Sequence, residues 1–370
     1  MKLQRSVALV CTFALLATMA LAQQAPATKR ALTHQDYDSW RSVVAQQVSR
    51  DGKFVAYAYV PQDADGEIVA RNIATGVDWR APRGYRPPVP PPDESIPNAA
   101  ELIAEQARLL RPVFTADSRF LVFGTEPTKA EITKAKKEKR KPEEMPKNGL
   151  GIMDLATGTV TRIERVKTFR VPEDGSGFIA YLSEPTPEPK PAAANPPSSS
   201  RTKKKEYGSE LTLRNTITGN ERKFADVLDF TISKDAKTLV FATSSHTEET
   251  NGVYAVTTAG DAPPTTLLSG KGKYQKLTWD EDNTQIAFIS DKEDAAAKQP
   301  KFRVYQWNLK DPQATEIVST SSPGFPKDMV ISEKANLSFS LDGSHLFIGS
   351  APPPEPEKSP DEEVPADEKV

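Results

Sequence analysis

The sequence predicts an all-β fold, a β-propeller of about six recognisable four-stranded blade repeats with proline-rich and basic insertions. Three observations lead to this prediction. A turn motif recurs six times, a hairpin motif follows most of its copies, and the spacing between the two motifs is constant wherever the chain is not interrupted.

The turn motif reads apolar, polar, any residue, Asp, a turn residue, and then three or four apolar or β-branched residues. An Asp followed by a small residue favours a tight turn, because the carboxylate accepts hydrogen bonds from its own backbone. The apolar runs that follow, such as 286–289, predict strands that are buried on both faces. The six copies lie at 48–57, 114–123, 171–181, 232–241, 279–288 and 339–348.

The hairpin motif ends in Thr-Gly or a close variant of it. Its clear copies are 69–76, 151–158 and 213–219, and its weaker copies are 253–260 and 304–311. The interval from the turn Asp to the hairpin glycine is the same for 51–76 and 235–260, and the return interval is the same for 158–174 and 219–235. Together the two intervals give a period of about 41 residues, the size of a propeller blade. An ordinary β-sandwich with incidental Asp-Gly turns would not repeat these intervals.

Proline is concentrated in the segments that interrupt this period. Of the 32 prolines among 370 residues, 19 lie in 82–97, 185–197 and the tail from Pro352. The insertions fall near 82–112, 128–148 and 185–207; the first should contain a helix capped by Asn98 and stopped by Pro112. The basic run 134–141 in the second is interpreted as a solvated loop or disordered spacer. The sixth repeat stops after its first strands, so a closed ring of blades is not fully encoded.

The N-terminal segment 1–22 has the features of a secretory signal peptide. Lys2 and Arg5 precede an apolar stretch that ends in Ala20-Leu21-Ala22. A membrane anchor is the alternative, but the apolar stretch 7–22 is short for a membrane span. Cleavage after Ala22 would leave a chain without cysteine, with a propeller over 23–351, an acidic proline-rich tail over 352–370 and no membrane span. The expected location is periplasmic or secreted.

Few residues suggest chemistry. His34, His246 and His345 are isolated in sequence and have no metal-ligand spacing, and no Gly-x-Ser-x-Gly occurs. The acidic segment 63–67 resembles a calcium loop only faintly and is better interpreted as a hairpin turn. The charge is balanced, with 48 basic and 50 acidic residues, and the run 134–141 lacks interleaved aromatic residues. We therefore expect no catalytic residue, no cofactor, no metal and no nucleic acid.

One segment is a candidate contact surface. Arg80, Arg83, Tyr85 and Arg86 are predicted to lie in a loop that leaves the first blade. Arginine and aromatic side chains at a propeller rim are suited to anchoring a peptide or a docked domain. The alternative is a proline-stiffened loop that packs on its own blade.

The segment 32–40, followed by the first turn motif, resembles the start of the exported bacterial members of the prolyl oligopeptidase family. The resemblance covers about 32–350, and its WD40-like repeat is shared with TolB-like propellers. It implies a propeller that covers an active site and filters peptides by size, with the catalytic Ser, Asp and His in a hydrolase domain that follows. None of those catalytic positions is found in this chain, so we expect it to be inactive alone.

Two functions remain open at this point. The first is the non-catalytic propeller portion of an exported serine peptidase, gating or docking peptide substrates or a hydrolase domain. The alternative is a stand-alone periplasmic TolB-like propeller that binds a protein partner.

Overall fold

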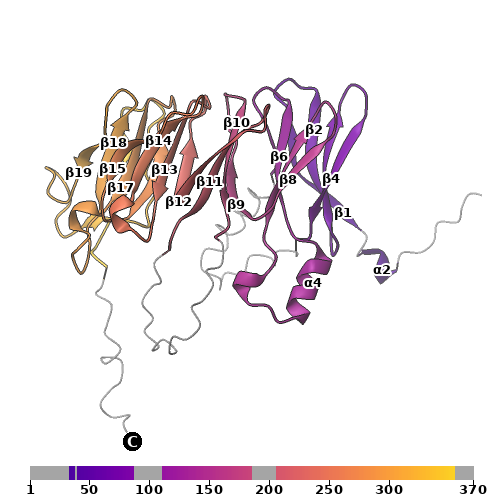
Figure 1. Cartoon of the computed structure of the whole chain (residues 1–370), viewed down its shortest axis with the longest axis horizontal. Helices are drawn as coiled ribbons and strands as arrows, with labels where there is room; N and C mark the ends of the chain where they lie inside the picture. The colour runs from indigo at the N-terminus through magenta and orange to yellow at the C-terminus, as the bar shows by residue number, and fades with distance from the viewer. Residues whose placement is uncertain (1–32, 38–39, 87–110, 186–205, 355–370) are drawn as a thin grey trace, which may run out of the picture. The chain divides into compact units, whose positions relative to one another are not determined.

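The computed structural model describes residues 33–37, 40–86, 111–185 and 206–354. Its fold is an all-β propeller, built from antiparallel sheets that follow one another along the chain (Figure 1). A short unit before Arg41 contains helix α2 (His34–Tyr37), which begins after Thr33. The sheets belong to a second unit that begins at Arg41.

Each of the first two sheets has four strands in chain order, which we call strands a to d. Neighbouring strands are antiparallel, which allows the short turns that join a to b and c to d. The strands of the first sheet are β1 (Arg41–Val48), β2 (Phe54–Pro61), β3 (Gly66–Asn72) and β4 (Asp78–Gly84). Those of the second are β5 (Val113–Phe114), β6 (Phe120–Thr125), β7 (Gly149–Asp154) and β8 (Val160–Ile163).

The third and fourth repeats share one strand. β12 is strand d of the third repeat up to about Asp226 and strand a of the fourth from Asp229, with a left-handed φ of 58° at Asp226 and a register shift just after it. The two predicted blades therefore form one seven-stranded sheet. Its strands are β9 (Val166–Arg170), β10 (Phe178–Ser183), β11 (Ser209–Asn215), β12 (Glu221–Ile232), β13 (Thr238–Thr243), β14 (Gly252–Thr257) and β15 (Thr265–Ser269).

The fifth repeat is a complete four-stranded sheet and the sixth is not. The fifth contains β16 (Tyr274–Trp279), β17 (Gln285–Ser290), β18 (Arg303–Asn308) and β19 (Thr315–Val318). The sixth has only strands a and b, each in two pieces: β20 (Val330–Ile331) pairs with β23 (Ser350–Ala351), and β21 (Ser338–Phe339) pairs with β22 (Leu346–Phe347). The expectation of an incomplete sixth repeat is confirmed for the residues described.

The a–b turns explain why the turn motif recurs. In four copies, a Ser or Thr donates its hydroxyl to the turn Asp at 2.5–2.7 Å and accepts the N–H five residues after itself at 2.9–3.1 Å. In the fifth copy, Asp280 accepts the equivalent N–H, from Gln285, at 3.2 Å. A polar residue two positions before the Asp therefore closes the turn. The four pairs are Ser49–Asp51, Thr115–Asp117, Ser233–Asp235 and Ser340–Asp342.

The c–d hairpins explain the second motif. The side-chain oxygens of Asn72, Asp154 and Asn215 each accept two backbone N–H groups, from the residues two and three positions on. The glycine four positions on has φ between +72° and +76° in all three copies, a conformation that favours glycine. The predicted Thr-Gly hairpins are therefore confirmed.

The core lies between successive sheets. Side chains of strands b and c alternate, so that one set contacts the preceding sheet and the other the following sheet. Leu121 and Phe123 pack with Ala56 of the first sheet, whereas Val122 packs with Ile179 of the next. Strand b is buried on both faces in this repeat and in the fifth, as the apolar runs predict.

One insertion differs from its prediction. The segment 128–148 was expected to be a solvated loop or spacer, but it contains helix α4 (Lys129–Lys137) and the 3-10 turn Pro142–Glu144. Thr128 and Glu131 form a capping box that starts the helix, and Ala135 is the buried residue within it. The lysine-rich composition was interpreted as a loop, although lysine has a good intrinsic helix propensity. Two further 3-10 turns are Glu248–Thr250 and Lys292–Asp294; the helix predicted between Asn98 and Pro112 falls mostly outside the described residues.

Candidate functional site

Every complete repeat has one end that carries the a–b and c–d turns, and its b–c connection, which is longer than those turns in all but the first repeat, lies at the other end. The a–b and c–d turns lie at the first end, which we call the a–b end. Strand b leads to strand c at the other, through 62–65, 126–148, 184–208, 244–251 and 291–302, which we call the b–c end. Variable connections on a rigid scaffold are where binding residues concentrate. The candidate site is therefore sought at the b–c end.

At this end the first and second sheets are joined through Gly84. Glu126 donates its N–H to the carbonyl of Arg83 at 2.6 Å, and Tyr85 donates its N–H to the carbonyl of Pro127 at 2.9 Å. Gly84, between them, has φ +101°, and a Cβ there would lie 1.9 Å from the carbonyl oxygen of Glu126. Only glycine allows the two backbones to approach so closely.

A cluster of one buried and two partly buried charged side chains lies beside this junction. Arg86 Nε is 2.6 Å from Glu126 Oε1, and Arg83 Nη2 is 3.7 Å from the same oxygen. Burial lowers the pKa of Arg83 to about 10, because its side chain is only 3% exposed, and the neighbouring charge of Arg86 adds to the effect while Glu126 opposes it. One glutamate thus holds two arginines at the end of strand d.

The cluster borders a small cavity. Its volume is about 30 Å³, enough for a molecule the size of water, and Thr125, Asn148, Lys167 and Thr168 are its other polar lining residues. Among the described residues, the second carboxylate oxygen of Glu126, Oε2, has no hydrogen-bond partner. A donor group in the cavity would satisfy this oxygen.

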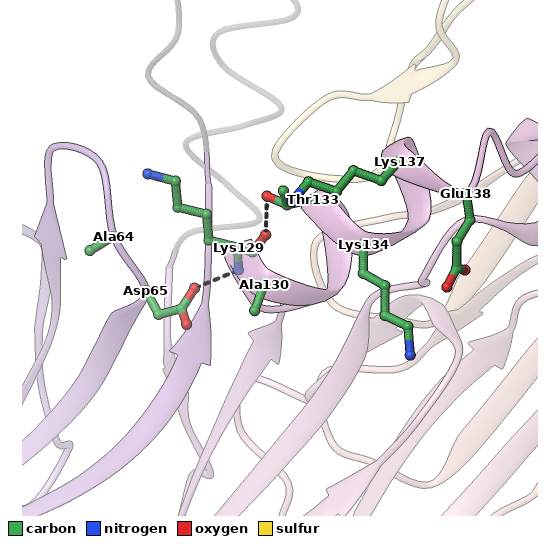
Figure 2. Close-up of a pocket in the computed structure, with 8 residues that line it drawn as sticks. All are labelled: Ala64, Asp65, Lys129, Ala130, Thr133, Lys134, Lys137 and Glu138. Atoms are coloured by element: carbon green, nitrogen blue, oxygen red, sulfur yellow. Dashed lines mark hydrogen bonds between the residues drawn. The ribbon is translucent and has the colours of Figure 1, made fainter.

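A second set of polar contacts holds helix α4 against the β2–β3 hairpin. Tyr85 donates its hydroxyl to Asp63 at 3.0 Å, and Lys129 Nζ lies 2.7 Å from the other oxygen of Asp63. Asp65 accepts the backbone N–H of Lys129 at 2.8 Å, at the first turn of the helix (Figure 2). The hydrogen bond from Lys129 lowers the pKa of Asp63, and the hydrogen bond to Asp63 raises the pKa of Tyr85. The acidic 63–67 segment is thus a hairpin turn that holds a lysine.

The helix and the hairpin border an open hollow of about 790 Å³, and Figure 2 shows the residues that line it. Three of its lining residues are lysines: Lys129, Lys134 and Lys137. Its acidic lining residues are Asp65 and Glu138. The hollow therefore has a net positive lining.

The predicted contact residues divide between two roles. Arg80 and Arg83 lie within strand β4 and not in a loop, which corrects their predicted placement, and Tyr85 and Arg86 follow that strand. Arg80 pairs with Asp78 and Glu67 of its own sheet, both at 3.1 Å. Arg83, Tyr85 and Arg86 hold the second repeat at the b–c end. Glu126 and Lys129 were missed, because only the fold brings them to β4.

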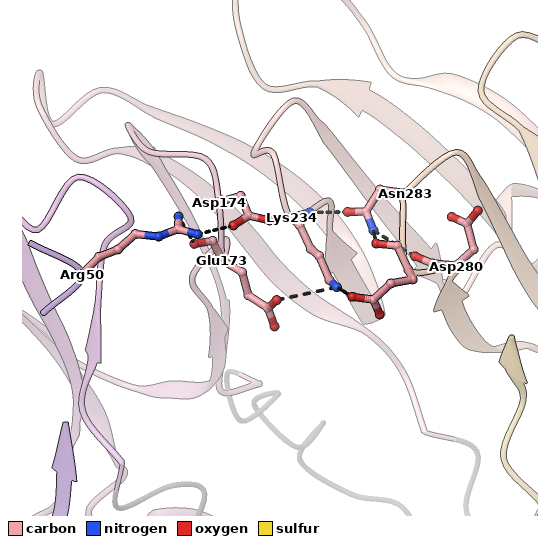
Figure 3. Close-up of polar contacts among 7 residues, drawn as sticks. Arg50, Glu173, Asp174, Lys234, Asp280 and Asn283 are labelled. Carbon is pink, nitrogen blue, oxygen red and sulfur yellow. Dashed lines mark hydrogen bonds and ion pairs between the residues drawn. The ribbon is translucent and has the colours of Figure 1, made fainter. Parts of the chain in front are cut away.

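The a–b end carries ion pairs between the turns of different repeats. Arg50 of the first sheet pairs with Asp174 of the third repeat at 2.7 Å, and Lys234 of the fourth contacts both Glu173 and Glu281 (Figure 3). These side chains are 29–73% exposed, so each pair contributes about 0–1 kcal/mol. Exposed ion pairs therefore tie neighbouring turns together at this end, whereas the b–c end carries the hollow beside α4.

The three histidines show no shared site. His246 stacks on Tyr207 with ring centroids 3.7 Å apart, and His345 lies exposed in the last a–b turn beside Ser344. In the part of the chain that the structure describes, no three His, Cys, Asp or Glu side chains are placed to hold a metal ion. The same residues contain no helix that is long and apolar enough to cross a membrane.

Comparison with known proteins returned similar structures but no similar sequences. No protein-family model matches the chain, and no curated protein matches it. The propeller domain of the trilobed protease from Pyrococcus furiosus is 10% identical, with a TM-score of 0.38 over 81% of this chain and 76% of that one. Acylaminoacyl peptidase from Pyrococcus horikoshii is 9% identical, with a TM-score of 0.39 over 84% of this chain and 43% of that one.

Two more solved structures are similar. A prolyl endopeptidase is 14% identical, with a TM-score of 0.42 over 91% of this chain and 44% of that one. An oligogalacturonate lyase, solved with manganese, is 14% identical, with a TM-score of 0.41 over 85% of this chain and 78% of that one. The chain thus spans less than half of the acylaminoacyl peptidase and prolyl endopeptidase chains.

Proposed function

We propose that this chain is a binding module, the non-catalytic propeller portion of an exported peptidase similar to the prolyl oligopeptidases, and that it docks peptide segments at its b–c end. The observation that carries the proposal is the lysine-lined hollow between helix α4 and the β2–β3 hairpin. The resemblance of the segment 32–57 to that family supports the peptide as the class of ligand.

The chemistry of the hollow favours acidic peptides. Lys129 is already bound to Asp63, but Lys134 and Lys137 have no ion pair with any described residue. An acidic side chain in the hollow would gain two ammonium partners that are not already neutralised.

The test compares one charge reversal at each end of the sheets. Fluorescence anisotropy would be measured with three labelled peptides of the same length and proline content, one acidic, one neutral and one basic. Lys134→Glu should weaken binding of the acidic peptide about tenfold, because it replaces an attractive contact by a repulsive one. Lys310→Glu makes the same charge change in an exposed c–d hairpin at the other end and should leave binding unchanged.

Two results would contradict the proposal. Equal affinity of the acidic peptide for both variants would show that α4 does not form the binding surface. Absence of binding by all three peptides at millimolar concentration would reject peptide docking at the b–c end.

A further inference from the structure

Helix α4 presents two lysines that have no ion pair with any described residue. Lys134 and Lys137 both line the hollow, and they are three positions apart, so they lie on the same face of the helix. The third lysine of the hollow, Lys129, is 2.7 Å from Asp63. Two like charges on adjacent turns of a helix repel each other, and carboxylates placed between them would remove this repulsion. The hollow therefore has the charge to bind a carboxylate-rich segment.

The chain itself contains such a segment, residues 355–370, which we call the acidic segment. It has seven acidic and two basic side chains, and three of the acidic ones are consecutive, at 361–363. Its charge is opposite in sign to that of the hollow, where three lysines face Asp65 and Glu138. Complementary charge of this kind favours association and fixes which surface is chosen.

The acidic segment begins at the end of the sheets that carries the hollow. Strand b runs toward the b–c end, and β23 (Ser350–Ala351) is the last piece of strand b in the sixth repeat. Gln299 belongs to the b–c connection 291–302, and its side-chain N–H donates to the carbonyl of Pro354 at 3.2 Å. Pro354 directly precedes the acidic segment, so the segment and the hollow share the b–c end.

The length of the acidic segment is sufficient to reach another repeat. Its 16 residues span about 50 Å when extended. A compact chain of about 300 residues has a radius of gyration of about 19 Å. Attachment to the same chain also keeps the local concentration of the segment high, in the millimolar range for flexible connections, so that a few ion pairs suffice for occupancy.

We propose that the acidic segment 355–370 of this chain occupies the lysine-lined hollow and competes there with acidic peptides from other proteins. This inference rests on the proposed function, because it assigns the regulation of the same site. Carboxylates of the segment contact Lys134 and Lys137, whereas Lys129 keeps its contact with Asp63. A hollow that is free in only a fraction of the molecules binds an added peptide with an affinity lowered by that fraction.

Two other occupants are outcomes of the test. Residues 87–110 follow Arg86 at the b–c end and contain four acidic residues and one arginine, but their charge is more dispersed and they offer no three consecutive carboxylates. The second is the acidic segment of another copy of the chain.

Carbodiimide cross-linking of the full chain tests the contact directly, because the reagent joins a carboxylate to a lysine amine only where the two groups touch. Unlabelled and isotope-labelled chains are mixed in equal amounts, and cross-linked peptides are identified by mass spectrometry. We expect cross-links from 361–368 to Lys134 or Lys137 that join peptides of the same label only. Lys136 is the matched control, since it is exposed on the same helix but does not line the hollow, and it should cross-link about fivefold less.

A binding measurement separates this inference from the proposed function. The full chain with Asp361→Asn, Glu362→Gln and Glu363→Gln should bind the labelled acidic peptide about fivefold more tightly than the unchanged chain. Its affinity for the neutral peptide should not change.

Three cross-linking results would overturn the inference even if acidic peptides bind: cross-links of Lys134 and Lys137 only to 87–110, cross-links only between chains of different label, or yields no higher than at Lys136. Equal affinity of the acidic peptide for the unchanged and the neutralised chain would also overturn it. Cross-links within one chain, with no peptide binding to the neutralised chain, would instead contradict the proposed function and support occupancy of the hollow by the chain's own segment.

Discussion

Replacing Gly84 by alanine should loosen the junction between the first and second sheets. The added Cβ would lie 1.9 Å from the carbonyl oxygen and 2.5 Å from the carbonyl carbon of Glu126. Both are backbone atoms, so no side-chain rotation can relieve the contact. The strand end or the β6–α4 connection must move, and this displaces the Arg83–Glu126 cluster.

The magnitude has two parts. An alanine in a left-handed conformation costs about 1–2 kcal/mol, and overpacking a well-packed site costs about 1–3 kcal/mol. Gly84→Ala should therefore lower the free energy of unfolding by about 2–5 kcal/mol. Gly260→Ala is the matched control, because Gly260 has φ +74° with no atom within 4 Å of an added Cβ, so only the first part applies.

The assay is urea unfolding at pH 7, followed by tryptophan fluorescence and far-ultraviolet circular dichroism on the same samples. The difference between the two variants isolates the steric part, about 1–3 kcal/mol. If Gly84→Ala and Gly260→Ala unfold at the same urea concentration with the same slope, the backbone contact does not exist in solution and the reasoning fails.

Three further predictions concern hydrogen bonds and charges. Ser233→Ala removes the hydroxyl of a residue that is 1% exposed and should lower the free energy of unfolding by about 1–3 kcal/mol. Ser340→Ala, in the exposed sixth turn, should lower it much less. Equal losses of unfolding free energy in urea would contradict this prediction. Glu126→Gln removes the carboxylate that contacts the buried Arg83 and the partly buried Arg86 and should cost about 3–5 kcal/mol, seen as a lower melting temperature. An unchanged melting temperature would show that this carboxylate contributes nothing to stability. The hydrogen bond from the Ser49 hydroxyl lowers the pKa of Asp51 below its usual 3.8. The Asp51 carboxylate therefore stabilises the fold above pH 3.8 and loses this contribution as the pH falls through its folded pKa. Asp51→Asn should be less stable at pH 7 and its stability less sensitive to acid below pH 3.8, and an unchanged dependence of stability on pH would refute this.

Much of the fold was predictable because its repeating turns are local. Each a–b turn is closed by a side chain that reaches only a few positions along the chain, as Ser49 does with Asp51 and Phe54. The glycines of the c–d hairpins are likewise required by local backbone conformation. Such interactions recur with the sequence period, and a single sequence displays them.

The candidate site was less predictable because its contacts are distant in sequence. Arg83 and Arg86 were recognised as contact residues, but their partner Glu126 lies beyond the first proline-rich insertion and belongs to another sheet. Lys129 and Asp63 are likewise far apart in the chain, and the helix that brings Lys129 to the hairpin lies in a lysine-rich segment interpreted as a loop. Its capping pair, Thr128 and Glu131, was the signal in the sequence that could have revealed it.

By itself the sequence determined the all-β class, the blade-sized period and the chemistry of most a–b turns, because all of these depend on residues close together in the chain. Only the tertiary structure decided that the third and fourth repeats share one sheet, that Arg83 is buried against Glu126, and that α4 encloses a lysine-lined hollow. The physical reason is that burial and ion pairing are properties of neighbours in space, which a repeat in sequence does not specify.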